Sequence, residues 1–176
     1  IIIKPGNILK IKNIKEKFDV VITQRMLINL LSWKEQQKGL ANIHGLLKPG
    51  GRYIMIENTD DSFLALNKMR NELGLKSILQ HWHNKFFDYG ELMSFMRGKF
   101  RLLKTHDLGL YYFLTRVYTP MFASFIGFGA KAVKDPIYGH SDNAARIIFE
   151  KLQDSIKIGK HRVFGPIQVL VFKRER

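Results

Sequence analysis

The sequence contains no cysteine and only 15 acidic residues. Without cysteine the chain can form no disulfide and no thiolate metal site, and this composition suits a reducing compartment, so we expect a cytoplasmic protein. The 29 Lys and Arg residues outnumber the acidic residues, which gives a formal net charge of +14. Such an excess favours polyanionic partners such as nucleic acid, although lysines scattered over solvated faces give the same total.

The sequence also lacks a hydrophobic run long enough to span a bilayer. Its most apolar stretch, residues 110–133, is interrupted by Arg116, Pro120 and Lys131. The uninterrupted part is shorter than the roughly 20 residues that a transmembrane helix needs. We therefore expect no transmembrane segment and interpret this stretch as a buried cap or lid, with membrane contact as the alternative. The 45% hydrophobic content is enough for the core of one domain.

A strand, a helix and a second strand are predicted in the first third of the chain. The continuous β-branched run at 18–23 (FDVVIT) predicts a strand that is covered on both faces. Ser32 and Glu35 form a capping box that predicts the start of a helix. Pro49-Gly50-Gly51 predicts a turn before the next strand, at 52–57. This order predicts a right-handed crossover and parallel pairing of the two strands.

Later elements follow from similar signals. Helices are expected before the stop at Gly74 and after a box-like start at Asp88. Extended segments are expected at 100–105, 108–114 and 167–172, and Ser141 or Asp142 is expected to cap a helix that runs to about Gln153.

The first third of the chain resembles the second half of a class I S-adenosylmethionine-dependent methyltransferase. In that family a strand ends in a Gly-Asp turn, an F-D-x-V-x-(S/T) strand follows, and a helix then leads into L-K-P-G-G and another strand. Here the turn is Gly6-Asn7-Ile8, the strand is 18–23, and L-K-P-G-G occupies 47–51 without change. The resemblance implies an α/β fold with an incomplete Rossmann-like sheet, mostly parallel, with one reversed strand near the edge.

The family's glycine-rich loop and ribose-binding acidic residue precede the segment that matches here. We therefore expect 1–176 to be a single partial methyltransferase domain, with 108–165 as a substrate-cap insertion. Residues 1–3 are expected to end a buried strand. The strand at 18–23 would lack a neighbour, and its exposed hydrophobic edge would favour oligomerisation.

The resemblance implies S-adenosylmethionine as the cofactor. Gly6, Asn7 and Ile8 occupy the positions that contact adenine in the family, and Thr23 and Gln24 those that border the sulfonium. The amide oxygen of an Asn can accept the adenine amine bond that the usual Asp accepts. The alternative is that Asn7 serves only its turn.

Candidate substrate-binding residues are Arg25, Asn58 and Tyr111. Arg25 follows the strand at the expected cleft and could bind a carboxylate or phosphate through two parallel hydrogen bonds. Asn58 follows the next strand. Tyr111 belongs to a Tyr-Tyr pair that either shapes a pocket or packs in the core.

No catalytic residue can be assigned, because methyl transfer is an in-line displacement that depends mostly on positioning. Candidates for a general base are Glu57, His81, His83 and His106. Glu57 could instead be a hydrogen-bonding group that closes a loop, and His81 and His83 could flank a Trp82 anchored on the core. The H-x-H pair lacks a third ligand at a defined spacing, so no metal site is expected.

The predicted function is methyl transfer to a small-molecule or sugar- or lipid-linked acceptor. One alternative is a fragment of a nicotinamide-dependent dehydrogenase, which has a similar sheet. Another is a basic RNA-binding module without catalysis, which would use the net charge.

Overall fold

The computed structural model describes residues 3, 5–11, 14–125, 136–152 and 165–175. They fall into two compact units. The first, which we call the sheet unit, comprises 1–59, 80–106 and 168–176. The second, the helical unit, comprises 60–79 and 107–167. Within the described ranges, no helix is both long enough and apolar enough to cross a membrane.

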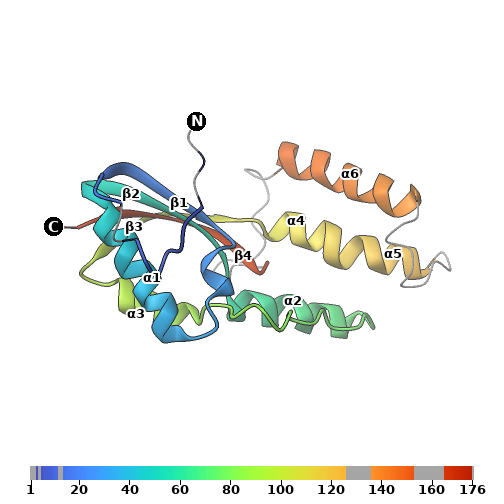
Figure 1. Cartoon of the computed structure of the whole chain (residues 1–176). Helices are drawn as coiled ribbons and strands as arrows, with labels where there is room; N and C mark the ends of the chain where they lie inside the picture. Colours follow the sequence, from blue (N-terminus) through green and yellow to red (C-terminus); the bar gives the residue numbers. More distant parts are fainter. Residues whose placement is uncertain (1–2, 4, 12–13, 126–135, 153–164, 176) are drawn as a thin grey trace. The chain divides into compact units, whose positions relative to one another are not determined.

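Four strands form one sheet in the order β1-β2-β4-β3 (Figure 1). Their bounds are Phe18–Gln24 for β1, Leu47–Asn58 for β2, Phe100–Asp107 for β3 and Ile167–Arg174 for β4. β1 and β2 are parallel. One strand is reversed, and Figure 1 shows it to be β4, next to the edge strand β3. The predicted α/β class, with a single reversed strand near the edge, is confirmed.

Helix α1 (Trp33–Leu46) connects β1 to β2 and packs against both. Ser32 caps α1 as predicted, because its hydroxyl accepts the backbone N–H of Glu35 at 3.2 Å; the same hydroxyl donates to the Glu35 carboxylate at 3.0 Å. Asp88 caps α3 (Tyr89–Met96) in the same way, with 2.7 Å to the N–H of Glu91. Both helix starts were therefore predictable from short polar side chains that satisfy free amide donors.

An aromatic cluster connects three strands of the sheet. The ring of Tyr53 on β2 stacks on Phe172 of β4 at 6.1 Å and lies 5.8 Å from Phe100 of β3. Rings at these separations contribute beyond the area that they bury. Among the helices of the sheet unit, Trp33 contacts Phe87 and Phe95 edge-on, and these contacts join α1 to the segment around α3.

The prediction of a turn at Pro49-Gly50-Gly51 before the strand is wrong, because β2 already begins at Leu47. Phe18 pairs with Leu47, but Val20 pairs with Arg52, so the intervening residues bulge out of the ladder. Gly50 has a φ of +75°, and a Cβ on Gly51 would lie 2.9 Å from the carbonyl oxygen of Lys48. Both glycines are therefore required for the bulge, for different reasons.

The expectation that β1 is covered on both faces is also wrong. Phe18, Val20 and Ile22 are 41%, 46% and 60% exposed. β1 has β2 as its one neighbour among the described strands and stands at the sheet edge. The apolar run correctly indicates a strand, but the run alone does not determine what covers it. Ile3, expected at the end of a buried strand, lies outside the strands and is 91% exposed, and residues 1–2 lie outside the described residues.

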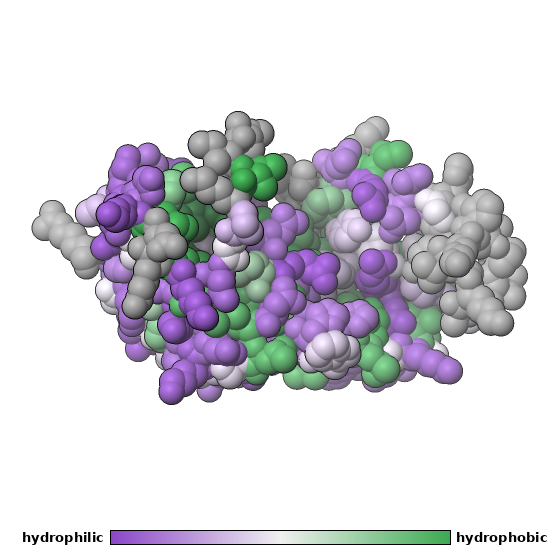
Figure 2. All heavy atoms as spheres, in the orientation of Figure 1, coloured by the Kyte–Doolittle hydropathy of each residue, from purple (hydrophilic) through white to green (hydrophobic). Residues whose placement is uncertain are grey.

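The helical unit contains α2 (Asp60–Glu72), α4 (Gly109–Phe113), a π-helix η2 (Leu114–Tyr118), α5 (Thr119–Phe125) and α6 (Pro136–Leu152). A cluster of Leu66, Tyr112 and Val117 forms a core of this unit. Figure 2 shows hydrophobic residues exposed between hydrophilic ones on the visible face.

Two sequence-based expectations in the helical unit are wrong. Residues 108–114 were expected to be extended but contain α4, since a short apolar run does not distinguish a strand from a buried helix. Helix α6 begins at Pro136, a residue type favoured in the first turn, and not at Ser141 or Asp142. Asp142 instead pairs with Arg146 one turn later, at 3.1 Å. The expected end at Gln153 lies outside the described residues.

We predict that the chain 1–176 self-associates through the exposed edge of β1. Ile22→Lys places a charge on this edge and should shift the sedimentation distribution to the monomer. Ile14→Lys adds the same charge at an exposed position outside the sheet and should leave the distribution unchanged. A wild-type chain that sediments as a monomer at every concentration would refute this.

Candidate functional site

The carboxyl ends of β1 and β2 lie side by side in the sheet unit. Gln24 pairs with Ile56, and the N–H of Arg25 donates to the carbonyl of Ile56 at 2.8 Å. The residues that follow both strands, Arg25 on one side and Glu57 on the other, are therefore brought to the same edge of the sheet. Ligands of open α/β sheets bind at this edge.

Glu57 is 1% exposed, and its carboxylate accepts three backbone N–H groups. Oε1 lies 3.1 Å from both Met26 N and Leu27 N, and Oε2 lies 3.3 Å from Ile28 N. Burial raises the pKa of the Glu57 carboxyl, and the hydrogen bonds from the amides act in the opposite direction. The carboxylate thereby caps the short 3-10 helix η1 (Leu27–Asn29) and closes the loop after β1.

Arg25 has a left-handed backbone, with φ of +47°, which is unusual for a residue with a side chain. Its carbonyl accepts the side-chain amide of Asn29 at 3.0 Å, which supports this conformation. Backbone strain of about 1 kcal/mol is typical of functional sites. The Arg25 side chain is exposed, as is that of the preceding Gln24, so both are accessible to a ligand.

Thr23 is buried and its hydroxyl lies 2.8 Å from the hydroxyl of Tyr53. Burial raises the pKa of Tyr53 well above its usual value. Thr23 therefore joins the strand end to the aromatic core of the sheet. Sequence reasoning missed Tyr53 as its partner, because the pairing depends on the register after the bulge.

Asn58 is 6% exposed, and its side-chain oxygen has no hydrogen-bond partner within the part of the chain that the structure describes. Its backbone carbonyl accepts the N–H of Phe87 at 3.0 Å. A buried acceptor without a partner is costly unless a ligand or water satisfies it. The Asn58 side chain is thus a candidate to accept a hydrogen bond from a ligand N–H or O–H.

Thr59 and Gln168 adjoin this position and were also missed by sequence reasoning. The Gln168 side-chain amide donates to the Thr59 hydroxyl at 2.8 Å, and both residues are buried. The available signal was a single polar residue, Gln168, within the otherwise apolar run 167–172 of β4. Their bond joins β4 to the end of β2.

The Gly6-Asn7-Ile8 segment forms a turn that is tied to α1. The Asn7 side-chain oxygen accepts the N–H of Leu9 at 2.8 Å, and Asn42 of α1 donates to the Ile8 carbonyl at 2.6 Å. The turn role that we considered as the alternative for Asn7 is thus present. A carbonyl oxygen has a second lone pair, so this bond leaves room for a ligand donor.

His81, His83 and His106 are exposed. The rings of His81 and His83 stack at 5.4 Å in a loop that lies outside helices and strands, and His106 is near the end of β3. Trp82 is 87% exposed, so the expectation that it anchors this loop on the core is wrong. Among the described residues, no three His, Asp or Glu side chains are placed to hold a metal.

Tyr111 belongs to the helical unit. Its ring contacts Tyr112 at 5.6 Å and Phe149 of α6 at 5.9 Å, both edge-on. It therefore helps to join α4 to α6 and is partly buried against the cluster around Leu66.

We predict that Glu57→Gln lowers the free energy of unfolding by about 2 kcal/mol. A Gln side chain keeps one acceptor oxygen but turns an NH2 group toward amides that can only donate. Urea unfolding at pH 7 measures the change. Glu91→Gln, at an exposed helix position, is the matched control and should change little. Equal stability of wild type and Glu57→Gln would contradict the capping role.

No family model matches the chain, and no curated protein matches it. Solved structures that align with it include the cyclase SpnF (14% identity, TM-score 0.48), covering 98% of this chain and 55% of that one. They also include an O-methyltransferase family protein from Burkholderia thailandensis (15% identity, TM-score 0.44), covering 97% of this chain and 34% of that one. A third is YcgJ from Bacillus subtilis (12% identity, TM-score 0.46), covering 97% of this chain and 69% of that one. The chain spans about half the length of the first and a third of the second. Similarities of this size assign no activity to the chain.

Proposed function

We propose that this protein takes part in S-adenosylmethionine-dependent methyl transfer. The observation that carries the proposal is the layout of the sheet unit. An F-D-V-V strand pairs in parallel with the strand that contains L-K-P-G-G, and a reversed strand lies next to the edge. These are the features that the sequence resemblance implies.

The proposed cofactor site lies at the carboxyl ends of β1 and β2. Gly6, Asn7 and Ile8 would contact the adenine, and Thr23 and Gln24 would border the methionine part. Asn58 was expected to contact the substrate, but its side-chain oxygen, which has no partner among the described residues, also suits the cofactor, because the cofactor carries N–H donors that such an oxygen can accept. The bound cofactor would supply the electrophilic methyl group.

In this proposal the protein contributes position more than acid-base chemistry. Glu57 holds the amides of residues 26–28 and so fixes the loop that carries Arg25. We assign Glu57 a positioning role, because its oxygens already accept three N–H groups. His81, His83 and His106 are candidates for a base only if the acceptor must lose a proton during transfer.

We further propose a small-molecule or sugar- or lipid-linked acceptor. The helical unit presents Tyr118, the last residue of the π-helix, and Met121 and Phe122 of α5, which are 48%, 37% and 43% exposed. Such irregular turns occur often at functional sites, and exposed apolar groups suit an apolar acceptor. Two contacts expected from the sequence are proposed separately, each within its own unit: Tyr111 as an aromatic contact in the helical unit, and Arg25 as a contact for an acidic group in the sheet unit.

Isothermal titration of S-adenosylmethionine into the protein as its gene encodes it tests the proposal. We expect saturable binding with one equivalent, and Asn58→Ala should weaken it about tenfold by removing the buried acceptor. Asn71→Ala, on an exposed helix position of the helical unit, is the control and should bind like wild type. A gene product that folds but binds no S-adenosylmethionine would overturn the proposal.

A further inference from the structure

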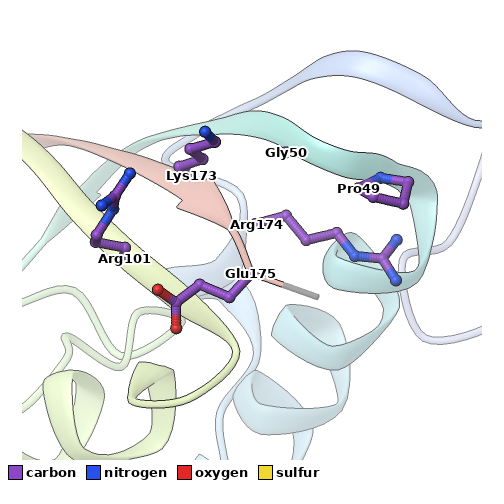
Figure 3. A pocket seen from close by; sticks show the side chains of 6 residues that line it. All are labelled: Pro49, Gly50, Arg101, Lys173, Arg174 and Glu175. Atoms are coloured by element: carbon purple, nitrogen blue, oxygen red, sulfur yellow. The ribbon is translucent and has the colours of Figure 1, made fainter.

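A pocket of about 520 Å³ lies at the start of β2, at the opposite end of that strand from Asn58. It is lined by Pro49, Gly50, Arg101, Lys173, Arg174 and Glu175 (Figure 3). All six residues belong to the sheet unit. From Arg52 to Asn58 the extended strand covers roughly 20 Å, so this pocket is separate from the proposed cofactor site.

The pocket lining carries three cations and one carboxylate. Arg101 is exposed and Lys173 is half-buried. Neither forms a side-chain hydrogen bond or ion pair with any residue that the structure describes. In the view of Figure 3 the Arg101 and Lys173 side chains extend upward from β3 and β4, and the Glu175 side chain lies below them, over β3. With three cations and one carboxylate, the lining keeps a net positive charge.

Arg174 is held in place by the bulge that contains Pro49 and Gly50. Its guanidinium donates to the carbonyl oxygen of Leu47, while its Nε is buried and has no partner among the described residues. Figure 3 shows this guanidinium beside Pro49, apart from the Arg101 and Lys173 side chains, so Arg174 contributes positive charge to the lining and not an accessible donor. Gly50 has no side chain that could fill the space above Lys173, whose Cε lies 3.5 Å from where a Cβ would be.

The cations beside this pocket also act on His44. Burial lowers the pKa of His44, and the charge of Arg174 lowers it further, as does that of Lys99. His44 lies in the last turn of α1, just before the bulge. Cations on β4 and before β3 therefore reinforce one another at this end of the sheet.

We propose that this pocket binds a phosphate-bearing anion through Arg101 and Lys173, with the charge of Arg174 nearby. Guanidinium groups match the geometry of phosphate oxygens, and a lysine adds a mobile point charge. The volume suits a group with more than one phosphate, carried either by a free small molecule or by a nucleic-acid strand. The site is independent of methyl transfer, and either proposal can fail without the other.

The first test is calorimetric titration of inorganic tripolyphosphate into the protein at low salt. We expect one saturable site, and Arg101→Ala with Lys173→Ala should weaken it at least about tenfold. The control is Arg97→Ala with Lys38→Ala, which removes the same charges from exposed positions outside the pocket. It should change the affinity less than about twofold if the pocket and not the net charge binds the anion.

A second titration uses a single-stranded uridine decamer with the same variants. If pocket substitutions weaken both ligands, a nucleic-acid strand supplies the phosphates. If the pocket substitutions weaken the binding of tripolyphosphate but not that of the decamer, the ligand is a free phosphate compound. Equal loss for the pocket and control variants, or no saturable binding of either ligand, would overturn the proposal.

A third measurement needs no substitution. Proton NMR of the wild-type protein should show the His44 pKa rising when tripolyphosphate is added, because the anion offsets the charge of Arg174. The exposed His81 and His83 are internal references that should move less. A His44 pKa unchanged at saturating tripolyphosphate would count against the site.

Discussion

The buried carboxylate of Glu57 determines the geometry of the candidate site. A carboxylate at this depth is stable only if hydrogen bonds replace its lost water. The three amides of residues 26–28 provide these bonds and so fix the chain just after β1 against the end of β2. Arg25, with its left-handed backbone, and the Asn58 oxygen, which no described residue satisfies, adjoin this contact. Loss of the carboxylate would release both strand ends together.

The two ends of β2 have opposite chemical characters. At its carboxyl end, neutral and acidic polar groups are buried, including Glu57, Asn58 and Thr59. At its start, the bulge through Gly50 lies beside cations of β3 and β4. The glycines of the L-K-P-G-G motif therefore serve the local backbone structure, because Gly51 permits close approach to the backbone of Lys48. The motif also leaves room for an anion next to Lys173 and Arg174.

Much of the sheet unit could be predicted because its signals are local. Ser32 and Asp88 each cap a helix through a side-chain bond three residues away, and the FDVVIT run forms β1. The bulge could not be predicted, since Pro-Gly-Gly is equally typical of a turn and the register depends on pairing with β1. The partners of Glu57 and Thr23 lie about 30 residues away, so no local pattern reveals them. The roles of Tyr53 and Gln168 likewise depend on contacts between distant strands.

The central claim is that a cofactor binds at the carboxyl ends of β1 and β2. Amide chemical-shift mapping by NMR tests this most directly, with S-adenosylmethionine added to the isotope-labelled protein as its gene encodes it. Binding at these strand ends should shift the amides of residues 23–28 and 57–59 and of Asn7, with little change at Gly50, Lys173 and Arg174. Saturable binding that shifts only residues away from these strand ends would contradict it.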